Sequence, residues 1–348
     1  MRHMASIGIL GSGTWGMALA RMLTNCGHDV TVWSFDPREI DGLETTRRQK
    51  NLPDMIIPEE TRFTREIEEV CREKELLLFA VPSFAVRSTA RLAAPFVFPG
   101  QLIVDVAKGL EPDTLYTMTQ VIRDEIPGVR AVALSGPTHA EEVARDLPTT
   151  IVSACRDEAT AQKVQDIFMN SCLRVYTNPD VEGVELCGAV KNIIALAAGI
   201  SAGLGFGDNT KAAIITRGMA EITRLGEAMG CLPQTFSGLA GIGDLIVTAT
   251  SRHSRNNRCG ELIGQGVPVQ EAVRRVGMVV EGINALPATL QLAARYGISM
   301  PITEAVDAVV NRGRSPAEAV TDLMGRAKKS EISGSVVYER MLFQNGKK

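Results

Sequence analysis

The sequence lacks the cysteine and histidine patterns of metal-binding and disulfide-bonded proteins. Its seven cysteines are scattered singly, no C-x-x-C pair occurs, and no histidine stands at metal-ligand spacing. We therefore expect no metal site. Because an odd number of cysteines cannot all pair within one chain, we also expect free thiols and a reducing compartment.

Long runs of one residue type are missing as well. Basic and acidic residues nearly cancel, to a formal net charge of -3, and no polybasic run is long enough for a nucleic-acid footprint. The longest apolar run, 193–207, is too short for a membrane span and holds four glycines. The first six residues leave no room for a signal peptide. We expect a cytoplasmic protein whose partners are small molecules or a second copy of itself.

What is present is a globular composition, 45% apolar and 22% charged, in a chain of 348 residues that can form two domains. In the first part, short runs rich in Val, Ile and Leu alternate with helix-period segments. Strands covered on both faces have this composition. We predict an α/β, Rossmann-like domain over 1–178 with a doubly wound, mainly parallel sheet. The expected strands are 7–10, 30–33, 76–81, 102–106, 131–134 and 150–154.

After Tyr176 the strand-like runs nearly disappear, and helical segments rich in Ala and Gly follow. Asn178 and Pro179 have the pattern of a helix N-cap and the first helical residue. We therefore predict a boundary near residue 178, an all-α domain over 179–335, and a short amphipathic tail over 336–348. The sequence shows no internal repeat and no low-complexity segment.

A glycine-rich segment directly follows the first expected strand. Gly11, Gly13 and Gly16 fit G-x-G-x-x-G and open the helical segment 17–25. Gly11 allows a tight turn, Gly13 lets the backbone approach a pyrophosphate, and Gly16 permits close packing of helix and strand. A glycine-rich turn of another α/β protein has the same pattern. Its place in the first βα turn favours a dinucleotide site at the helix N-terminus.

The residues after the second expected strand leave the choice of cofactor open. An NAD enzyme usually has an acidic residue there for the ribose 2′-hydroxyl, whereas this chain has Trp33, Ser34 and Phe35. Asp36 comes later and either contacts the ribose or opens an ordinary turn, while Arg38 could sit near a 2′-phosphate. We expect NAD(P)H, with NADPH slightly favoured.

Two further strand ends carry polar residues. Lys108 follows strand 102–106 at its carboxyl end, where ligands of open α/β sheets bind, although a solvated loop lysine would look the same. Gly136 and Thr138 follow strand 131–134. Backbone N–H groups and the Thr138 hydroxyl could hold a substrate oxygen there, or Thr138 could only cap a helix. His139, without a recognisable partner, is taken as structural or exposed.

The helical half holds three more polar segments. Lys191 and Asn192 lie in a long apolar helix, where a lysine indicates chemistry unless it extends to the surface. Asp244 and Thr248 are four residues apart and share one helix face, or Asp244 merely caps that helix. Residues 254–256, Ser-Arg-Asn, supply a hydroxyl, a guanidinium fork and an amide, which suit a phosphate or a polar surface loop.

Together these motifs resemble those of the bacterial NAD(P)-dependent glycerol-3-phosphate dehydrogenases. Taken singly none is decisive, but six in the family's order over nearly the whole chain are specific. The resemblance implies a homodimer that reduces dihydroxyacetone phosphate reversibly to sn-glycerol 3-phosphate for phospholipid biosynthesis. The matching segments are 11–16, 107–109, 135–138, 190–192, 241–245 and 254–256.

The resemblance also implies roles for single residues, with Lys191 as the general acid/base. Phe35 departs from the polar or basic residue often found at its position. The expected substrate-binding residues are Lys108, Gly136, Thr138, Lys191, Asp244, Ser254, Arg255 and Asn256. The expected cofactor-binding residues are Gly11, Gly13, Thr14, Trp15, Gly16, Phe35, Lys108, Ala140, Arg255, Val279 and Glu281.

In the expected mechanism, hydride passes from the nicotinamide to the substrate C2 while Lys191 protonates the developing alkoxide. Lys108 is the neighbouring cation that helps lower the pKa of Lys191, and Asn192 with Asp244 orients the lysine and the substrate. Arg255 anchors the phosphate.

Two other functions compete with this one. β-Hydroxyacid dehydrogenases and related 2-oxoacid reductases share the plan and the helix lysine. They place an asparagine four residues after it, where this chain has Ala195. A non-catalytic NAD(P) sensor would need the glycine-rich loop but not Lys108, Lys191 and Arg255 together.

Overall fold

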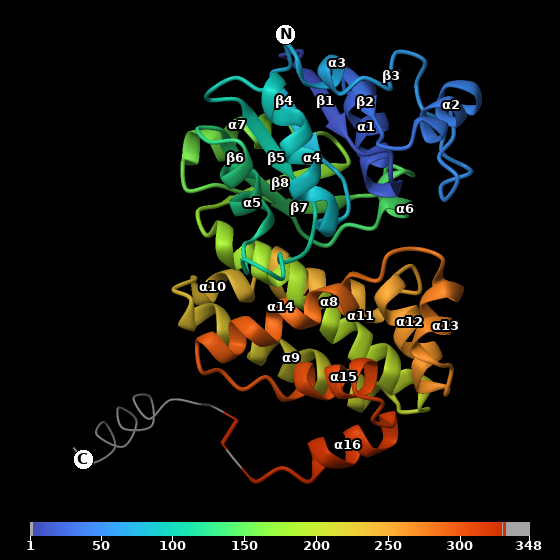
Figure 1. The fold of residues 1–348 in the computed structure, drawn as a ribbon, viewed down its shortest axis with the longest axis vertical. Coiled ribbons are helices and arrows are strands. Elements are labelled where there is room, and N and C mark those ends of the chain that lie inside the picture. The colour runs from blue at the N-terminus through green and yellow to red at the C-terminus, as the bar shows by residue number, and fades with distance from the viewer. Residues whose placement is uncertain (1–2, 329, 332–348) are drawn as a thin grey trace, which may run out of the picture.

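The computed structural model describes residues 3–328, 330 and 331. It consists of a sheet covered by helices and, below it in Figure 1, a bundle of helices. The predicted fold class, a Rossmann-like sheet followed by an all-helical part, is confirmed. The expected tail over 336–348 lies outside the described residues.

A single eight-stranded sheet forms the first part, in the order β3-β2-β1-β4-β5-β6-β7-β8. All neighbouring strands are parallel except β6 and β7, which are antiparallel. The strand order reverses between β1 and β4, so their carboxyl ends border the crevice where open α/β sheets bind ligands. The strands are β1 (Ser6–Leu10), β2 (Asp29–Trp33), β3 (Arg62–Thr64), β4 (Leu76–Phe79), β5 (Leu102–Asp105), β6 (Arg130–Ser135), β7 (Thr149–Ala154) and β8 (Leu173–Asn178).

Six of these strands match the apolar runs of the sequence, whereas β3 and β8 are not among the predicted strands. β3 has only three residues, too few to form a recognisable run. β8 lies at the sheet edge, and its first residues alternate between buried and exposed. An edge strand with one face in solvent has no continuous apolar run, so its pattern differs from that of the inner strands.

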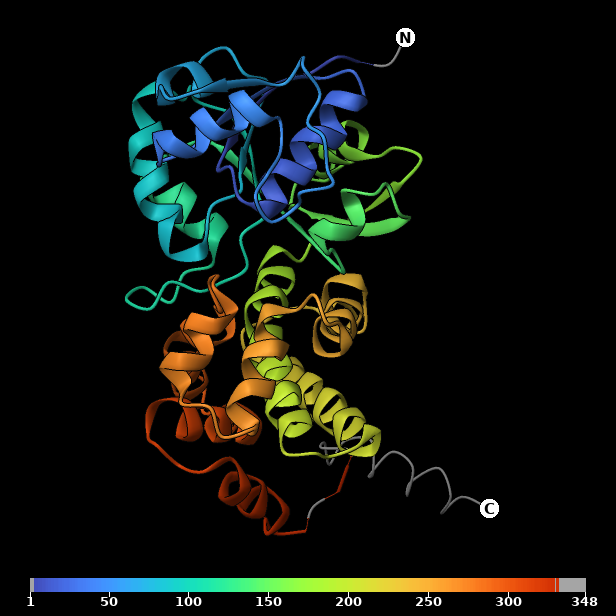
Figure 2. The same cartoon turned by 90° about the vertical axis from the view of Figure 1, so that its right-hand side faces the viewer.

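Both faces of the sheet are covered, as Figures 1 and 2 show. Leu76 and Leu78 of β4 join the apolar cluster that includes residues of α1 and α7, while Leu77 and Phe79 join the cluster with α4 and α5. Successive strand residues point to opposite faces, which explains why β4 is apolar throughout. The helices of this part are α1 (Thr14–Asn25), α2 (Pro37–Thr46), α3 (Ile67–Cys71), α4 (Val86–Ala93), α5 (Met118–Glu125), α6 (Ala140–Val143) and α7 (Glu158–Phe168), with 3-10 turns η1 (Ser83–Ala85) and η2 (Ala94–Phe96).

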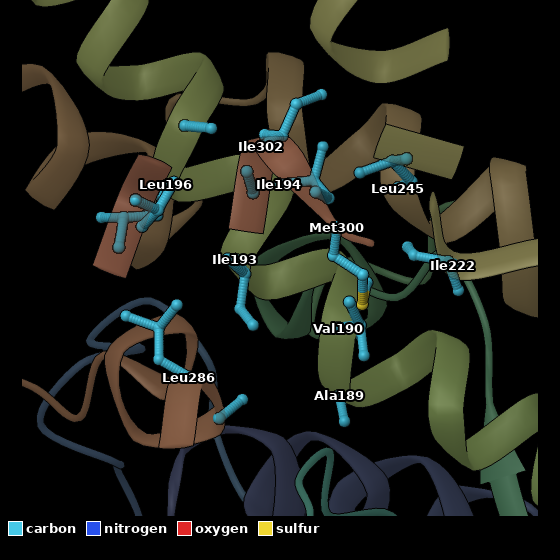
Figure 3. Packing of buried hydrophobic residues seen from close by; sticks show 14 of the residues in the cluster. Ala189, Val190, Ile193, Ile194, Leu196, Ile222, Leu245, Leu286, Met300 and Ile302 are labelled. Carbon is cyan, nitrogen blue, oxygen red and sulfur yellow. The ribbon is translucent and has the colours of Figure 1, made fainter. Parts of the chain in front are cut away.

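One long helix, α8, forms the centre of the helical part. Figure 3 shows its Val190, Ile193 and Ile194 among side chains from several surrounding helices, including Ile222 and Leu286. The helices are α8 (Val181–Gly203), α9 (Asp208–Ala228), α10 (Pro233–Phe236), α11 (Asp244–Thr250), α12 (Arg255–Gly264), α13 (Val269–Val276), α14 (Glu281–Arg295), α15 (Pro301–Asn311) and α16 (Pro316–Met324), with a π turn η3 (Leu239–Gly243).

Small residues bring α8 and α12 into backbone contact. A Cβ atom on Gly199 would lie 2.1 Å from the carbonyl oxygen of Asn257, and one on Gly260 would lie 2.2 Å from that of Leu196. Neither position can carry a side chain without moving a helix. α8 is also, among the described residues, the one helix long and apolar enough to cross a membrane, but 89% of that window is buried inside the protein. It is therefore a core helix.

The start of α8 differs from the predicted one. β8 extends to Asn178, and Asp180, not Asn178, is the N-cap residue, because its carboxylate accepts a hydrogen bond from the N–H of Gly183 at 3.0 Å. Asn178 instead accepts from the N–H of Asp180. The sequence offers two capping residues close together, and Asp180 is the one whose carboxylate also accepts from the N–H of Leu232 and from the hydroxyl of Thr235 on α10. The cap therefore ties the end of the sheet to the helical part.

Candidate functional site

Lys191 lies on α8 and is only 4% exposed, so it does not extend to the surface. Its Nζ donates hydrogen bonds to Oδ1 of Asp244 and to Oγ1 of Thr248, each at 2.5 Å. Both partners belong to α11, and the one-turn spacing between them places them side by side. The N-cap position of α11 belongs to Gly243, so Asp244 is the lysine's partner and not the cap.

Lys108 reaches the same carboxylate from the sheet. The chain after β5 extends to the helical part, where Leu110 joins its apolar core. Lys108 Nζ donates to Oδ2 of Asp244 at 2.7 Å and to the carbonyl oxygen of Gly136 at 3.1 Å. Thr138 Oγ1 donates to that same carbonyl. Two lysines from different parts of the chain thus share one carboxylate that is 1% exposed.

The surroundings of Lys191 change its proton affinity. Burial, together with the positive charge of Lys108, lowers the pKa of Lys191 to about 7, although the negative charge of Asp244 acts in the opposite direction. Near neutral pH, both the ammonium and the free amine are therefore populated. A group with such a pKa can both donate and accept a proton, which is what a reversible acid/base needs.

Asn192 and Asn256 have other partners than expected. Asn192 Oδ1 accepts from Asn256 Nδ2 at 2.9 Å, and Asn192 Nδ2 donates to the carbonyl of Gly188. Asn256 Oδ1 accepts from the N–H of Gly282 at 2.8 Å. In the described part of the chain neither amide bonds to Lys191. The two asparagines tie α8, α12 and α14 together beside the lysine.

The segment expected to bind phosphate forms the start of α12. Ser254 is the N-cap residue, and its Oγ accepts from the N–H of Asn257. Arg255 is the first helical residue, partly exposed, and its guanidinium has no hydrogen bond or ion pair with the residues that the structure describes. A helix N-terminus beside an unpaired guanidinium suits an anion.

The glycine-rich loop fits the tasks predicted for it. Gly11 has φ +119°, and a Cβ there would lie 2.5 Å from the carbonyl of Ala80. A Cβ on Gly16 would lie 2.5 Å from the carbonyl of Gly11, whereas one on Gly13 would meet nothing within 4 Å. Thr14 Oγ1, at the start of α1, is buried without a partner. Two tight glycines, one open glycine and an unpaired hydroxyl fit a bound pyrophosphate.

The other residues expected at the cofactor come from several elements. Trp15 packs against the apolar cluster of the sheet, and Ala140 begins α6, which packs against α1. Val279 lies just before α14, whose first residue is Glu281. The Glu281 carboxylate accepts from the N–H and the hydroxyl of Ser83, at 3.2 and 2.7 Å, and so joins the helical part to the turn after β4.

The residues that follow β2 differ in their exposure and in their hydrogen-bond partners. Phe35 is 80% exposed. Asp36 is the N-cap residue of α2 and accepts hydrogen bonds from the N–H and the guanidinium of Arg38. Of the alternatives for Asp36, the structure therefore shows the local turn that opens a helix. Glu39, in the first turn of α2, accepts hydrogen bonds from Ser12 and Ser34.

His139 connects the two parts of the molecule. Its Nε2 lies 3.4 Å from the carbonyl oxygen of Val247 on α11, and its ring centroid lies 5.8 Å from that of His253. Burial lowers the pKa of His139, so the ring is mainly neutral at pH 7. The sequence shows neither partner, because both are distant along the chain.

Three residues near the crevice are absent from the sequence prediction. Glu39 and Ser83 have the contacts given above, and Phe84, next to Ser83, is 70% exposed beyond the carboxyl end of β4. For Ser83 and Phe84 the available signal was a polar and an aromatic residue shortly after an apolar strand. Glu39 lies in a helix turn, where an acidic residue normally needs no further explanation.

Comparison with known proteins identifies similar chains over nearly the full length. The family model described as NAD-dependent glycerol-3-phosphate dehydrogenase N-terminus matches residues 6–161, and the corresponding C-terminus model matches residues 180–321. Glycerol-3-phosphate dehydrogenase (NAD(P)+) 2 of Lactobacillus delbrueckii subsp. bulgaricus is 65% identical over 336 residues, which cover 95% of this chain and 100% of the relative. That of Agathobacter rectalis is 51% identical over 331 residues, or 95% and 98% of the two chains.

A solved structure is similar as well. The crystal structure of glycerol-3-phosphate dehydrogenase from Coxiella burnetii superposes with a TM-score of 0.90 at 35% identity, covering 93% of this chain and 99% of that one.

Proposed function

Because this chain belongs to the NAD-dependent glycerol-3-phosphate dehydrogenase family, we propose that it reduces dihydroxyacetone phosphate reversibly to sn-glycerol 3-phosphate with NAD(P)H. It is an oxidoreductase, and its product is the backbone of glycerophospholipids. The observation that carries the proposal is the pair of lysines, Lys108 and Lys191, that share the buried carboxylate of Asp244.

In the proposed reaction, the bound cofactor supplies the hydride. Lys191 gives its proton to the oxygen of the substrate carbonyl as that oxygen becomes an alkoxide, and takes a proton back in the reverse direction. Asp244 and Thr248 hold Lys191 Nζ in place. Lys108, paired with the buried carboxylate of Asp244, contributes a second positive charge near the forming alkoxide.

The remote part of the substrate is held by the start of α12. Arg255 binds the phosphate through its unpaired guanidinium, assisted by the free N–H groups of the helix N-terminus. This binding energy positions the carbonyl beside Lys191. A non-catalytic sensor would have no use for the acid/base, and a β-hydroxyacid dehydrogenase would have no use for a phosphate anchor.

Arg255→Ala is expected to raise the KM for dihydroxyacetone phosphate by about tenfold to a hundredfold, since a charge-assisted bidentate contact is lost. Steady-state kinetics at saturating cofactor measure this. The matched control is Arg252→Ala, three residues earlier and exposed, which should leave KM nearly unchanged. If both variants had the KM of the wild type, Arg255 would not be the phosphate anchor.

We propose further that the enzyme is a homodimer in the cytoplasm. A hollow of about 750 Å³ lies between α9, α15 and α16, lined mainly by apolar side chains such as Val306 and Leu323. Met324 at its border is 82% exposed. Apolar surface of this kind favours self-association. None of the seven cysteines, all of which lie in the described part of the chain, forms a disulfide, which suits a reducing compartment. Light scattering should give twice the protomer mass of 37.5 kDa; a protomer mass would refute the dimer.

A further inference from the structure

Glu39, in the first turn of α2, is fixed by two hydroxyl groups. Its Oε2 accepts hydrogen bonds from Ser12 Oγ at 2.5 Å and from Ser34 Oγ at 2.9 Å. Ser12 lies in the glycine-rich loop between Gly11 and Gly13, and Ser34 directly follows β2. The carboxylate is therefore held at the carboxyl ends of two neighbouring strands, β1 and β2.

The position of Glu39 corresponds to the place where the adenosine ribose of a bound dinucleotide lies. In a doubly wound sheet the pyrophosphate lies over the glycine-rich loop, and the adenosine ribose lies beyond the end of the second strand. The present inference rests on the proposed function only in that a dinucleotide binds here. The Glu39 carboxylate then faces the ribose hydroxyls.

Glu39 can accept further hydrogen bonds. Both serines bind Oε2, whereas Oε1 faces Lys50 Nζ at 3.6 Å, which is longer than a hydrogen bond. Oε1 thus keeps lone pairs for a hydroxyl donor. The side chain is 39% exposed, so a ligand can reach it.

The cations beside this place, Arg38 of α2 and Lys50 beyond its end, both face carboxylates. Arg38 binds Asp36 with both Nε and Nη2, at 3.0 and 2.8 Å. Lys50 is the cation that faces Glu39 itself. A 2′-phosphate would add roughly two negative charges at this position. To be neutralised, it would have to attract one of these cations away from the carboxylate that the cation now faces.

The arginines that follow α2 are engaged as well. Arg47 donates to the carbonyl oxygen of Thr61 at 2.7 Å, and Arg48 donates to that of Pro53. Both guanidinium groups thus bind backbone carbonyl oxygens and not the carboxylate of Glu39. The surroundings of the ribose position therefore favour a hydroxyl over a phosphate.

We propose that Glu39 is a specificity-determining residue that makes NADH, and not NADPH, the preferred cofactor. Its carboxylate accepts the 2′-hydroxyl of NADH and repels the 2′-phosphate of NADPH. Ser12 and Ser34 position the carboxylate for this task. The slight NADPH preference expected above depends on residues 33–38, and Glu39 lies one position beyond them.

The test is the binding of each cofactor to the full chain without substrate. Titration followed by nicotinamide fluorescence gives both Kd values at one ionic strength, since salt screens the phosphate charge. We expect NADH to bind at least about tenfold more tightly than NADPH. In Glu39→Gln, which keeps the shape and removes the charge, the ratio of the two Kd values should approach one, and Ser12→Ala should shift it less in the same direction.

Glu44→Gln is the matched control, because Glu44 lies on the same helix but pairs with Arg65. It should keep the wild-type ratio. Tighter or equal NADPH binding by the wild type would overturn the proposal, and so would an unchanged ratio in a Glu39→Gln variant with the wild-type melting temperature. Failure to bind either cofactor would contradict the proposed function itself, which separates the two failures.

Discussion

Replacing Lys191 with methionine is expected to lower kcat for the reduction of dihydroxyacetone phosphate by about a hundredfold or more. General acids typically contribute at least this factor. Methionine fills a similar volume, and Asp244 keeps Lys108 as its partner, so the fold should persist. The Kd for the cofactor should stay within about twofold of the wild type, since only the proton transfer is lost.

The pH dependence gives this prediction a second readout. Reduction needs the protonated amine, and the pKa of Lys191 is lowered to about 7, so kcat for reduction should fall as the pH rises through about 7. Oxidation of sn-glycerol 3-phosphate needs the free amine, so its kcat should fall as the pH drops below about 7. Both limbs should vanish in Lys191→Met.

The control for Lys191 is Lys211→Met, which changes a lysine of α9 that pairs with Asp208 away from the lysine pair. It should have wild-type kinetics in both directions. A Lys191→Met enzyme with kcat within about tenfold of the wild type, or with both pH limbs intact, would remove Lys191 from the acid/base role.

Asp244→Asn is expected to have the second largest effect, because one carboxylate serves two lysines. Without its negative charge, nothing opposes the burial and the Lys108 charge that lower the pKa of Lys191. The pKa should then fall further below 7, so less of the ammonium is present at pH 7.5. We expect kcat for reduction at that pH to fall by about a hundredfold, and to recover partly in more acidic buffer.

The same substitution should destabilise the protein. Lys191 and Lys108 bind different oxygens of Asp244, and asparagine has an NH2 group in place of one of them, so one ammonium loses its acceptor. Breaking a buried ion pair costs about 3–5 kcal/mol. Urea denaturation measures this loss. Thr248→Val is the control, because it removes a hydrogen bond to Lys191 but no charge, and its pH profile should not move. A pH profile of Asp244→Asn that matches the wild type would contradict the role given to the carboxylate.

Much of the fold could be predicted because its patterns are local. The inner strands are apolar throughout, since both faces of the sheet are covered, and the glycines of the first loop mark a turn with tight backbone contacts. The edge strand β8 could not be found in this way, because its exposed face breaks the apolar run. The N-cap of α8 was misplaced for a related reason: the carboxylate of Asp180 is held by the N–H of Leu232 and the hydroxyl of Thr235, which are distant along the chain.

The fold class, the glycine-rich loop and the residue types of the site could be predicted from the amino-acid sequence, because these depend on neighbours along the chain. Which of these groups meet depends on how distant segments pack together. Asp244 lies 53 positions from Lys191 and 136 from Lys108, and Glu39 lies 27 positions from Ser12. Such contacts produce no periodic pattern of residue types along the sequence, since they arise where strand ends and helices pack together. The lowered pKa of Lys191 has the same origin, because burial by distant segments and the charge of Lys108 cause it.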